Sequence, residues 1–122
     1  MTDLSITRYS VEKLIPYVRN ARTHSDEQIA QIMASIAEFG FVNPILIDDN
    51  GGIIAGHGRL MAARMLGIKQ VPAIRLKHLS ETQRRALMIA DNKIAENASW
   101  DENLLRQELQ ALEGEDFNLS LL

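Results

Sequence analysis

The sequence contains no cysteine. That absence excludes disulfide bonds, thiolate metal sites and a cysteine nucleophile. It also lacks a signal-peptide pattern and any apolar run long enough to cross a membrane, so we expect a cytoplasmic protein with no membrane partner. There is no excess of positive charge either, because the formal net charge is −3. Proteins that bind DNA mainly through phosphate contacts are usually basic, so strong DNA binding by this chain alone is not expected.

What the sequence does contain is the composition of one ordinary globular domain. Hydrophobic residues make up 46% of it and charged residues 24%, a balance that is typical of folded proteins. Apolar periodicity, capping residues and glycine stops predict an α+β fold with a small mixed sheet. Strands are expected near residues 5–9, 44–48, 52–55 and 71–76, and helices near residues 25–39, 58–66, 80–96 and 101–112.

Several local patterns carry structural expectations. The Asn-Gly pair between two apolar runs predicts a β-hairpin, with Asp48 and Asp49 in its turn facing solvent. Ser-x-x-Gln patterns at residues 25–28 and 80–83 predict a capping box at the start of each of two helices. Trp100, the only tryptophan, is expected to anchor the last helix to the core.

The stretch with the clearest chemistry is residues 53–63, where a β-type run meets Gly56-His57-Gly58 and Arg59 then begins an Ala/Leu/Met-rich helix. A strand, a glycine turn and a helix start together bind anions, because the first N–H groups of the helix point outward at the positive end of its dipole. Glycine lets a ligand approach the backbone closely, and Arg59 adds a charged fork suited to phosphate oxygens. A plain strand-to-helix turn with a solvated arginine is the alternative, since one Gly-x-Gly is weak evidence alone.

Three motifs in order give this chain a resemblance to a known family. Residues 55–63 (Ala-Gly-His-Gly-Arg-Leu-Met-Ala-Ala) resemble the Gly-x-x-Arg-x-x-Ala box of the ParB/sulfiredoxin superfamily. Residues 35–45 are similar to its Ser-Ile-x-x-x-Gly-x-x-x-Pro-Ile segment, and residues 66–74 to its Leu-Gly and Val-Pro-x-Ile pattern. The resemblance covers about residues 5–97, and it implies a ParB-like domain at 1–97 followed by a helical extension at 98–122.

The resemblance implies a site for a nucleoside triphosphate. Its phosphate-binding residues would be Ser35, Gly40, Gly56, His57, Gly58 and Arg59. For Ser35 the alternative is a hydroxyl bonded to the preceding turn of its own helix. Arg22, in an exposed connection, is a candidate to reach the same anion, although a solvated loop arginine is the safer interpretation.

A metal site is implied as well. Asp91 and Asn92 align with a Glu-Asn pair that helps to hold the metal on the triphosphate in ParB domains, and a carboxylate with an amide oxygen suits Mg²⁺ when phosphates supply further ligands. The family's arginine three residues later is replaced by Ala95. The alternative is that Asp91 and Asn92 are ordinary surface residues late in a helix and bind no metal.

The central box also departs from the family. The partition proteins have an acid at the position of His57 and a base at Gly58, so CTP hydrolysis and CTP preference do not carry over to this chain. Sulfiredoxin has its catalytic cysteine at the position of His57, so its reductase activity is excluded. A histidine with an ordinary pKa of about 6.5 can act as a general acid or base. For His57, donating a hydrogen bond to phosphate is the less demanding role and the one we favour. The other histidines, His24 and His78, are expected on the surface.

The pattern from Arg85 through Trp100 to Leu112 resembles ParB-like domains fused to, or encoded with, phage-type DNA methyltransferases. The apolar end of the sequence suggests a domain cut from a longer chain, so a DNA methyltransferase is one identity for the full-length protein. DNA would then be reached through a fused or partner domain, and a homodimer is a further expectation. The most basic local stretch consists of Arg75, Lys77, Arg84 and Arg85. These side chains could contact nucleic acid, but a solvated outer face of a helix is the commoner outcome for such a stretch.

Two classes of function remain open. One is a ParB-like module that binds CTP or ATP, hydrolyses it weakly at most, and serves DNA modification or partition. The other is an enzyme, either a DNA nuclease or a nucleotide-dependent kinase of a small molecule. A nuclease needs a cluster of carboxylates for two metals, and near the expected site Asp91 is the one carboxylate. A kinase needs a base, for which His57 is the candidate, so the binding module fits the sequence better.

Overall fold

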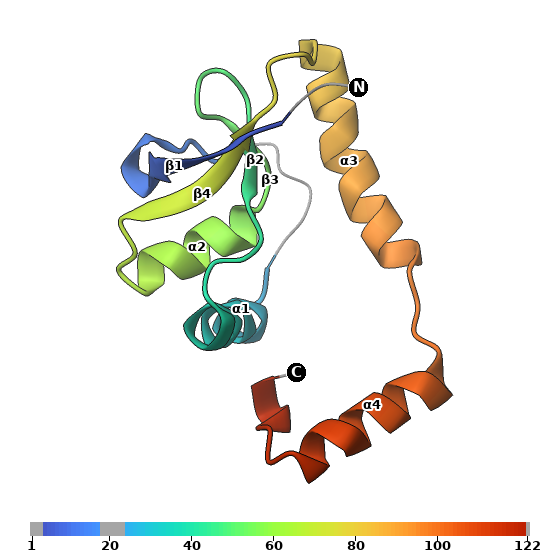
Figure 1. Ribbon diagram of the computed structural model, residues 1–122. Coiled ribbons are helices and arrows are strands. Elements are labelled where there is room, and N and C mark those ends of the chain that lie inside the picture. Colours follow the sequence, from blue (N-terminus) through green and yellow to red (C-terminus); the bar gives the residue numbers. More distant parts are fainter. Residues whose placement is uncertain (1–3, 18–23, 122) are drawn as a thin grey trace.

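The computed structural model describes residues 4–17 and 24–121, and these form the predicted α+β fold (Figure 1). The strands are β1 (Ile6–Ser10), β2 (Ile45–Ile47), β3 (Ile53–Ala55) and β4 (Gln70–Arg75). The α-helices are α1 (Asp26–Phe39), α2 (His57–Met65), α3 (Glu81–Asn97) and α4 (Glu102–Gly114), and Val11–Lys13 and Leu119–Leu121 form single 3-10 turns. Every predicted strand and α-helix is therefore confirmed, with bounds that shift by a residue or two.

The sheet is mixed, with the strand order β1-β4-β2-β3. β4 pairs antiparallel with β1, where Tyr9 lies opposite Val71, and parallel with β2, where Ile45 lies beside Ala73. β2 and β3 form the predicted antiparallel hairpin. This topology places the carboxyl end of β3 directly before the start of α2.

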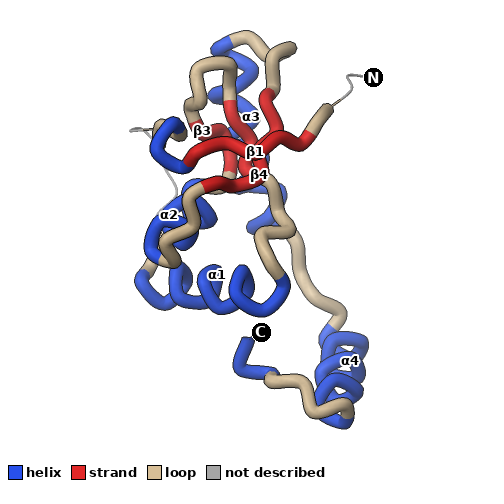
Figure 2. The backbone as a smooth tube through the Cα atoms, turned by 60° about the vertical axis from the view of Figure 1, so that its left-hand side comes forward, coloured by secondary structure: helices blue, strands red, loops and turns tan. Residues whose placement is uncertain are grey.

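Helices cover both faces of the sheet (Figure 2). Ile53 and Ile54, neighbours on β3, point to opposite faces, as strand geometry requires. Ile53 joins the main core, where α2 packs on the sheet, and Ile54 joins a smaller cluster with Leu76 and with Met88 of α3. The main core consists of Val11, Leu14, Ile45, Ile47, Ile53, Leu60, Ala63, Val71 and Ala73. α1 packs against α2 on the side away from the sheet (Figure 2).

The hairpin turn corrects one expectation, because Asp48 does not simply face solvent. Its Oδ1 accepts the backbone N–H groups of Asn50 and Gly52, each at 2.8 Å, and its Oδ2 lies 2.8 Å from Nη1 of Arg84 on α3. One carboxylate thus closes the turn and ties α3 to the sheet.

The two Ser-x-x-Gln starts differ from each other. At α3 the capping box is complete, because Ser80 Oγ accepts the Gln83 N–H and Gln83 Oε1 accepts the Ser80 N–H. At α1 Ser25 Oγ accepts the Gln28 N–H, but the Gln28 side chain bonds to His24 instead. The predicted box at residues 25–28 is therefore only half formed.

α4 follows an extended segment and lies apart from the sheet (Figure 1). The expectation that Trp100 anchors it to the core is wrong, since Trp100 is 73% exposed and the segment holding it leads away from the body. The chain after α4 returns to α1, where the rings of Phe39 and Phe117 stack with centroids 6.2 Å apart. Within the described residues, no helix combines the length and apolar character needed to cross a membrane.

Candidate functional site

The candidate site begins at the turn between β3 and α2. Gly56 is the N-cap of α2 and has a φ of +108°, a backbone conformation that side chains rarely adopt. A Cβ at this position would lie 3.0 Å from Nη2 of Arg59 and 3.1 Å from Cγ1 of Ile45. Gly56 is therefore required both for the sharp turn and for the guanidinium that lies beside it.

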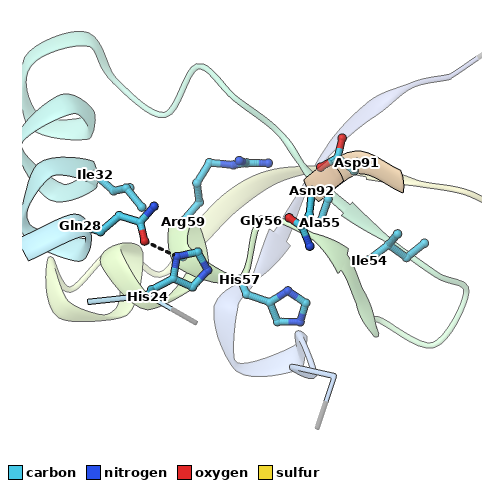
Figure 3. A pocket seen from close by; sticks show the side chains of 11 residues that line it. His24, Gln28, Ile32, Ile54, Ala55, Gly56, His57, Arg59, Asp91 and Asn92 are labelled. Carbon is cyan, nitrogen blue, oxygen red and sulfur yellow. Dashed lines mark hydrogen bonds between the residues drawn. The ribbon is translucent and has the colours of Figure 1, made fainter. Parts of the chain in front are cut away.

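A pocket of about 120 Å³ opens at this turn (Figure 3). Its lining comes from the start of α1, the end of β3, the first turn of α2 and the middle of α3. The lining residues are His24, Gln28, Ile32, Ile54, Ala55, Gly56, His57, Gly58, Arg59, Asp91 and Asn92. The structure thus gathers most of the predicted phosphate-binding residues and both predicted metal ligands around one space.

Arg59 stands between this pocket and a second hollow. Its Nη2 donates to the carbonyl oxygen of Pro44 at 2.9 Å, so the side chain also ties α2 to the chain before β2. The second hollow, of about 200 Å³, is lined by Ser35, Gly40 and Arg59 among others. Ser35 and Gly40 therefore lie beyond Arg59 and do not line the first pocket, and Arg22 lies outside the described residues.

His57 is the first residue of α2, and its ring is already hydrogen-bonded. The backbone N–H of Tyr17 donates to Nε2 at 3.1 Å, so Nδ1 carries the proton of the neutral ring. Burial lowers the pKa of His57, and the nearby His24 lowers it further. Burial is the larger of these two causes. Because Tyr17 occupies the lone pair of Nε2, this nitrogen is not available as a general base.

His24 corrects another expectation, since it lines the pocket together with His57. A Cβ on Gly58 would lie 3.0 Å from Cε1 of His24, so the imidazole packs directly against the first turn of α2. The sequence separation of these residues concealed the contact. The available signal was the placement of His24 four residues before Gln28 at a helix start, where the two side chains can meet. His78 is exposed, as expected.

The predicted metal ligands come from adjacent positions on α3. Nδ2 of Asn92 donates to the Met88 carbonyl at 3.1 Å, which fixes the orientation of the amide. Among the described residues, no group of three or more His, Asp or Glu side chains could hold a metal by itself. One carboxylate and one amide oxygen fit Mg²⁺ when a bound phosphate and water complete its shell.

The basic stretch is divided by the fold. Arg84 pairs with Asp48 and lies over the Tyr17 ring at 5.8 Å, while Arg75 lies over the Tyr9 ring at 5.5 Å. Arg75 and Lys77 line a different hollow, near β1. These cations therefore do not form one continuous surface for nucleic acid.

Comparison with known proteins identifies relatives of this chain. The profile of the ParB N-terminal domain matches residues 2–93. The ParB-like nuclease domain-containing protein YnaK of Escherichia coli (strain K12) is 52% identical over 82 residues, which are 67% of this chain and 94% of that protein. The nucleoid occlusion protein of Bacillus cereus (strain AH820) is 35% identical over 92 residues, 72% of this chain but 28% of that protein. The chain thus spans nearly all of the first relative and less than a third of the second.

Solved structures agree with the fold. The C-terminally truncated chromosome-partitioning protein ParB from Caulobacter crescentus, complexed with CTP-γ-S, superposes with a TM-score of 0.73 at 25% identity over 91% of this chain and 65% of that one. Sulfiredoxin from Arabidopsis thaliana superposes with a TM-score of 0.58 at 24% identity over 68% of this chain and 97% of that one, a likeness of fold alone. The fold is that shared by ParB N-terminal domains and sulfiredoxin.

Proposed function

Since this chain belongs to the ParB N-terminal domain family, we propose that it is a nucleotide-binding module that takes a nucleoside triphosphate, CTP or ATP, together with Mg²⁺. The observation that carries the proposal is the pocket shared by the first turn of α2 and the middle of α3. The Caulobacter neighbour, which is complexed with a CTP analogue, supports the same class of ligand.

The size and lining of the pocket suit a phosphate group. A volume of about 120 Å³ is well below the roughly 300 Å³ at which pockets for whole drug-sized ligands begin. The first N–H groups of α2 and the Arg59 guanidinium supply donors for phosphate oxygens. The hollow with Ser35 and Gly40, on the other side of Arg59, would hold the next part of the nucleotide.

Mg²⁺ would be held by the Asp91 carboxylate and the Asn92 amide oxygen, with phosphate oxygens as further ligands. When bound, it would neutralise phosphate charge. Little hydrolysis is expected from the isolated domain, because Tyr17 occupies Nε2 of His57 and Asp91 is the one carboxylate that the described part of the chain contributes to the lining. For the same reason the nuclease and small-molecule kinase alternatives have less support.

We further propose that the module serves DNA modification or partition in the cytoplasm and reaches DNA through a fused or partner domain. The net charge of −3 and the divided basic stretch argue against strong DNA binding by the chain itself. The sequence pattern after Arg85 supports an association with phage-type DNA methyltransferases. A homodimer and the division into residues 1–97 and 98–122 belong to the same proposal.

Titration calorimetry with each of the four ribonucleoside triphosphates, with and without Mg²⁺, tests this function. We expect Mg²⁺-dependent binding of CTP or ATP with a Kd between micromolar and millimolar, about −4 to −8 kcal/mol. No heat with any nucleotide would refute the proposal and favour a protein-interaction module. Rapid phosphate release that disappears in His57→Ala would make the protein an enzyme instead.

Arg59→Ala tests the phosphate role within the same experiment. Binding should be lost, and the free energy of unfolding should also fall by about 1–2 kcal/mol because the bond to Pro44 is lost. Arg106→Ala, on the exposed surface of α4, is the matched control and should leave binding unchanged. Binding that persists in a folded Arg59→Ala protein would remove Arg59 from the site.

A further inference from the structure

We infer that His24 is a phosphate ligand of this pocket and that Gln28 positions its ring. The inference rests on the proposed nucleotide-binding function and adds a ligand from the start of α1. It accounts for two polar side chains in the lining that the central sequence box does not contain.

The orientation of His24 is fixed by one hydrogen bond. Its Nδ1 lies 2.9 Å from Oε1 of Gln28. An amide oxygen can only accept, so Nδ1 carries a proton and donates it. Nε2 is then the ring nitrogen left on the side away from Gln28 (Figure 3).

The start of α3 supplies an internal comparison. There Gln83 occupies the same helical position as Gln28 but completes a capping box with the Ser80 N–H at 2.9 Å. Gln28 gives up that bond to its own helix and holds His24 instead. The same Ser-x-x-Gln start is thus used for helix capping in α3 and for orienting an imidazole in α1.

The position of the ring suits an anion bound at the start of α2. Cε1 and Nδ1 of His24 lie 3.0 and 3.1 Å from the place where a Gly58 Cβ would stand, so only glycine allows this approach. The ring therefore lies against the first turn of α2, beside the N–H groups to which we assign phosphate binding.

The lining that the structure describes offers an anion one other cationic side chain, the Arg59 guanidinium, while the Asp91 carboxylate is assigned to Mg²⁺. Among the described residues, the titratable groups that line the pocket with His24 are His57 and Arg59 of α2 and Asp91 of α3. Nε2 of His57 already accepts from Tyr17. His24, in its imidazolium form, can donate through Nε2 a charge-assisted hydrogen bond to a phosphate oxygen.

Calorimetry with CTP and ATP in the presence of Mg²⁺ tests the inference on His24→Ala, with His78→Ala as the histidine control. We expect affinity to fall about tenfold to a hundredfold in His24→Ala, the usual effect of losing a hydrogen bond to a charged group. His78→Ala should bind as the wild type does, because His78 lies outside the pocket.

A pH series separates a ligand from a merely structural residue. The terminal phosphate of a nucleotide itself titrates with a pKa of about 6, so the quantity to follow is the ratio of wild-type to His24→Ala affinity. Because only an imidazolium can donate through Nε2 while Nδ1 donates to Gln28, that ratio should be larger at pH 6 than at pH 8. His24→Gln, which is polar but cannot be charged, should lack the rise and provides a second variant if His24→Ala folds poorly.

Gln28→Ala tests the positioning role, with Gln83→Ala as its matched control at the start of α3. Gln28→Ala should weaken binding less than His24→Ala, and Gln83→Ala should not weaken it. If the wild type binds no nucleotide, the proposed function itself fails. If the wild type binds and His24→Ala binds equally well or more tightly, only this inference is overturned, and tighter binding would mean that His24 occupies the place of the phosphate.

Discussion

The body formed by the sheet with α1 and α2 differs sharply from the C-terminal segment formed by the end of α3 and by α4. In the described residues, every buried hydrophobic side chain lies between Val11 and Met88, and α4 has none. The match to the ParB N-terminal domain also ends in α3, at residue 93. The body therefore has its own core, whereas the C-terminal segment leaves large apolar side chains exposed, among them Ile94, Trp100 and Leu104.

The difference shows what hydrophobic periodicity can predict. In α2 and in α4 the apolar pattern correctly predicts a helix, because local spacing and capping residues determine helix formation. It does not determine what the apolar face contacts. Leu60 of α2 is buried against the sheet, while Leu104 of α4 is 59% exposed. Tertiary contacts decide burial, and they differ between the two regions.

The largest expected effect sharpens this contrast directly. Ile53→Ala should lower the free energy of unfolding by about 2–5 kcal/mol, because the side chain is fully buried in the main core. Ile94→Ala, at a site that is 70% exposed on α3, should change it by less than about 0.5 kcal/mol. Urea denaturation of both variants measures the two values. Equal losses would mean that the C-terminal segment is as well packed as the body.

The sequence predicted the strands, the helices and the residues around the central box, because each depends on local signals. The residue contacts that it missed include several between positions far apart in the sequence. Asp48 and Arg84 are separated by 36 positions and Tyr17 and His57 by 40, so no local pattern reports that they meet. The position of His24 in the pocket was missed for the same reason, because its contact with α2 forms only when α1 packs against α2. The ligand roles of the box residues stay predictions that the binding experiments test.

The second expected effect compares a glycine from each region. Gly56→Ala should cost about 1–3 kcal/mol of unfolding free energy, because the φ of +108° strains any side chain and the new Cβ would crowd Arg59. Gly114→Ala, at the end of α4, meets open space. It should be neutral or stabilise by up to about 1 kcal/mol, since alanine favours helix. Thermal unfolding of both variants measures these changes. A Gly56→Ala protein as stable as the wild type would contradict the turn geometry described for Gly56.

The third expected effect concerns α3, whose start is tied to the body while its end is not. Arg84→Gln should lower the free energy of unfolding by about 1 kcal/mol, because it removes a half-buried ion pair with Asp48 and the contact with the Tyr17 ring. Arg85→Gln, the exposed neighbour on the same helix, is the control and should have almost no effect. Chemical denaturation of both variants measures the two free energies of unfolding. Losses of the same size would show that the contacts of Arg84 with Asp48 and Tyr17 do not stabilise the protein.

The smallest expected effect is a pH dependence that originates in the body, at His57. Burial and the charge of His24 lower the pKa of His57 in the folded protein below its ordinary 6.5. Between the two pKa values the unfolded chain binds more protons than the folded one, so stability increases with pH across that window. The contribution of His57 is complete above about pH 6.5 and is lost as the pH falls toward the folded pKa.

Denaturation curves from pH 8 down to pH 5 measure this dependence in the wild type and in His57→Gln. Glutamine cannot titrate and still offers an acceptor to the Tyr17 N–H, so the variant should lose stability less steeply below about pH 6.5. His78→Gln, at an exposed histidine outside the pocket, should follow the wild-type curve. Because the C-terminal segment after residue 97 contains no histidine, it has no side chain whose ordinary pKa lies in this range. A wild-type slope retained in His57→Gln would place the responsible group elsewhere in the body, and His24 would be the next position to substitute.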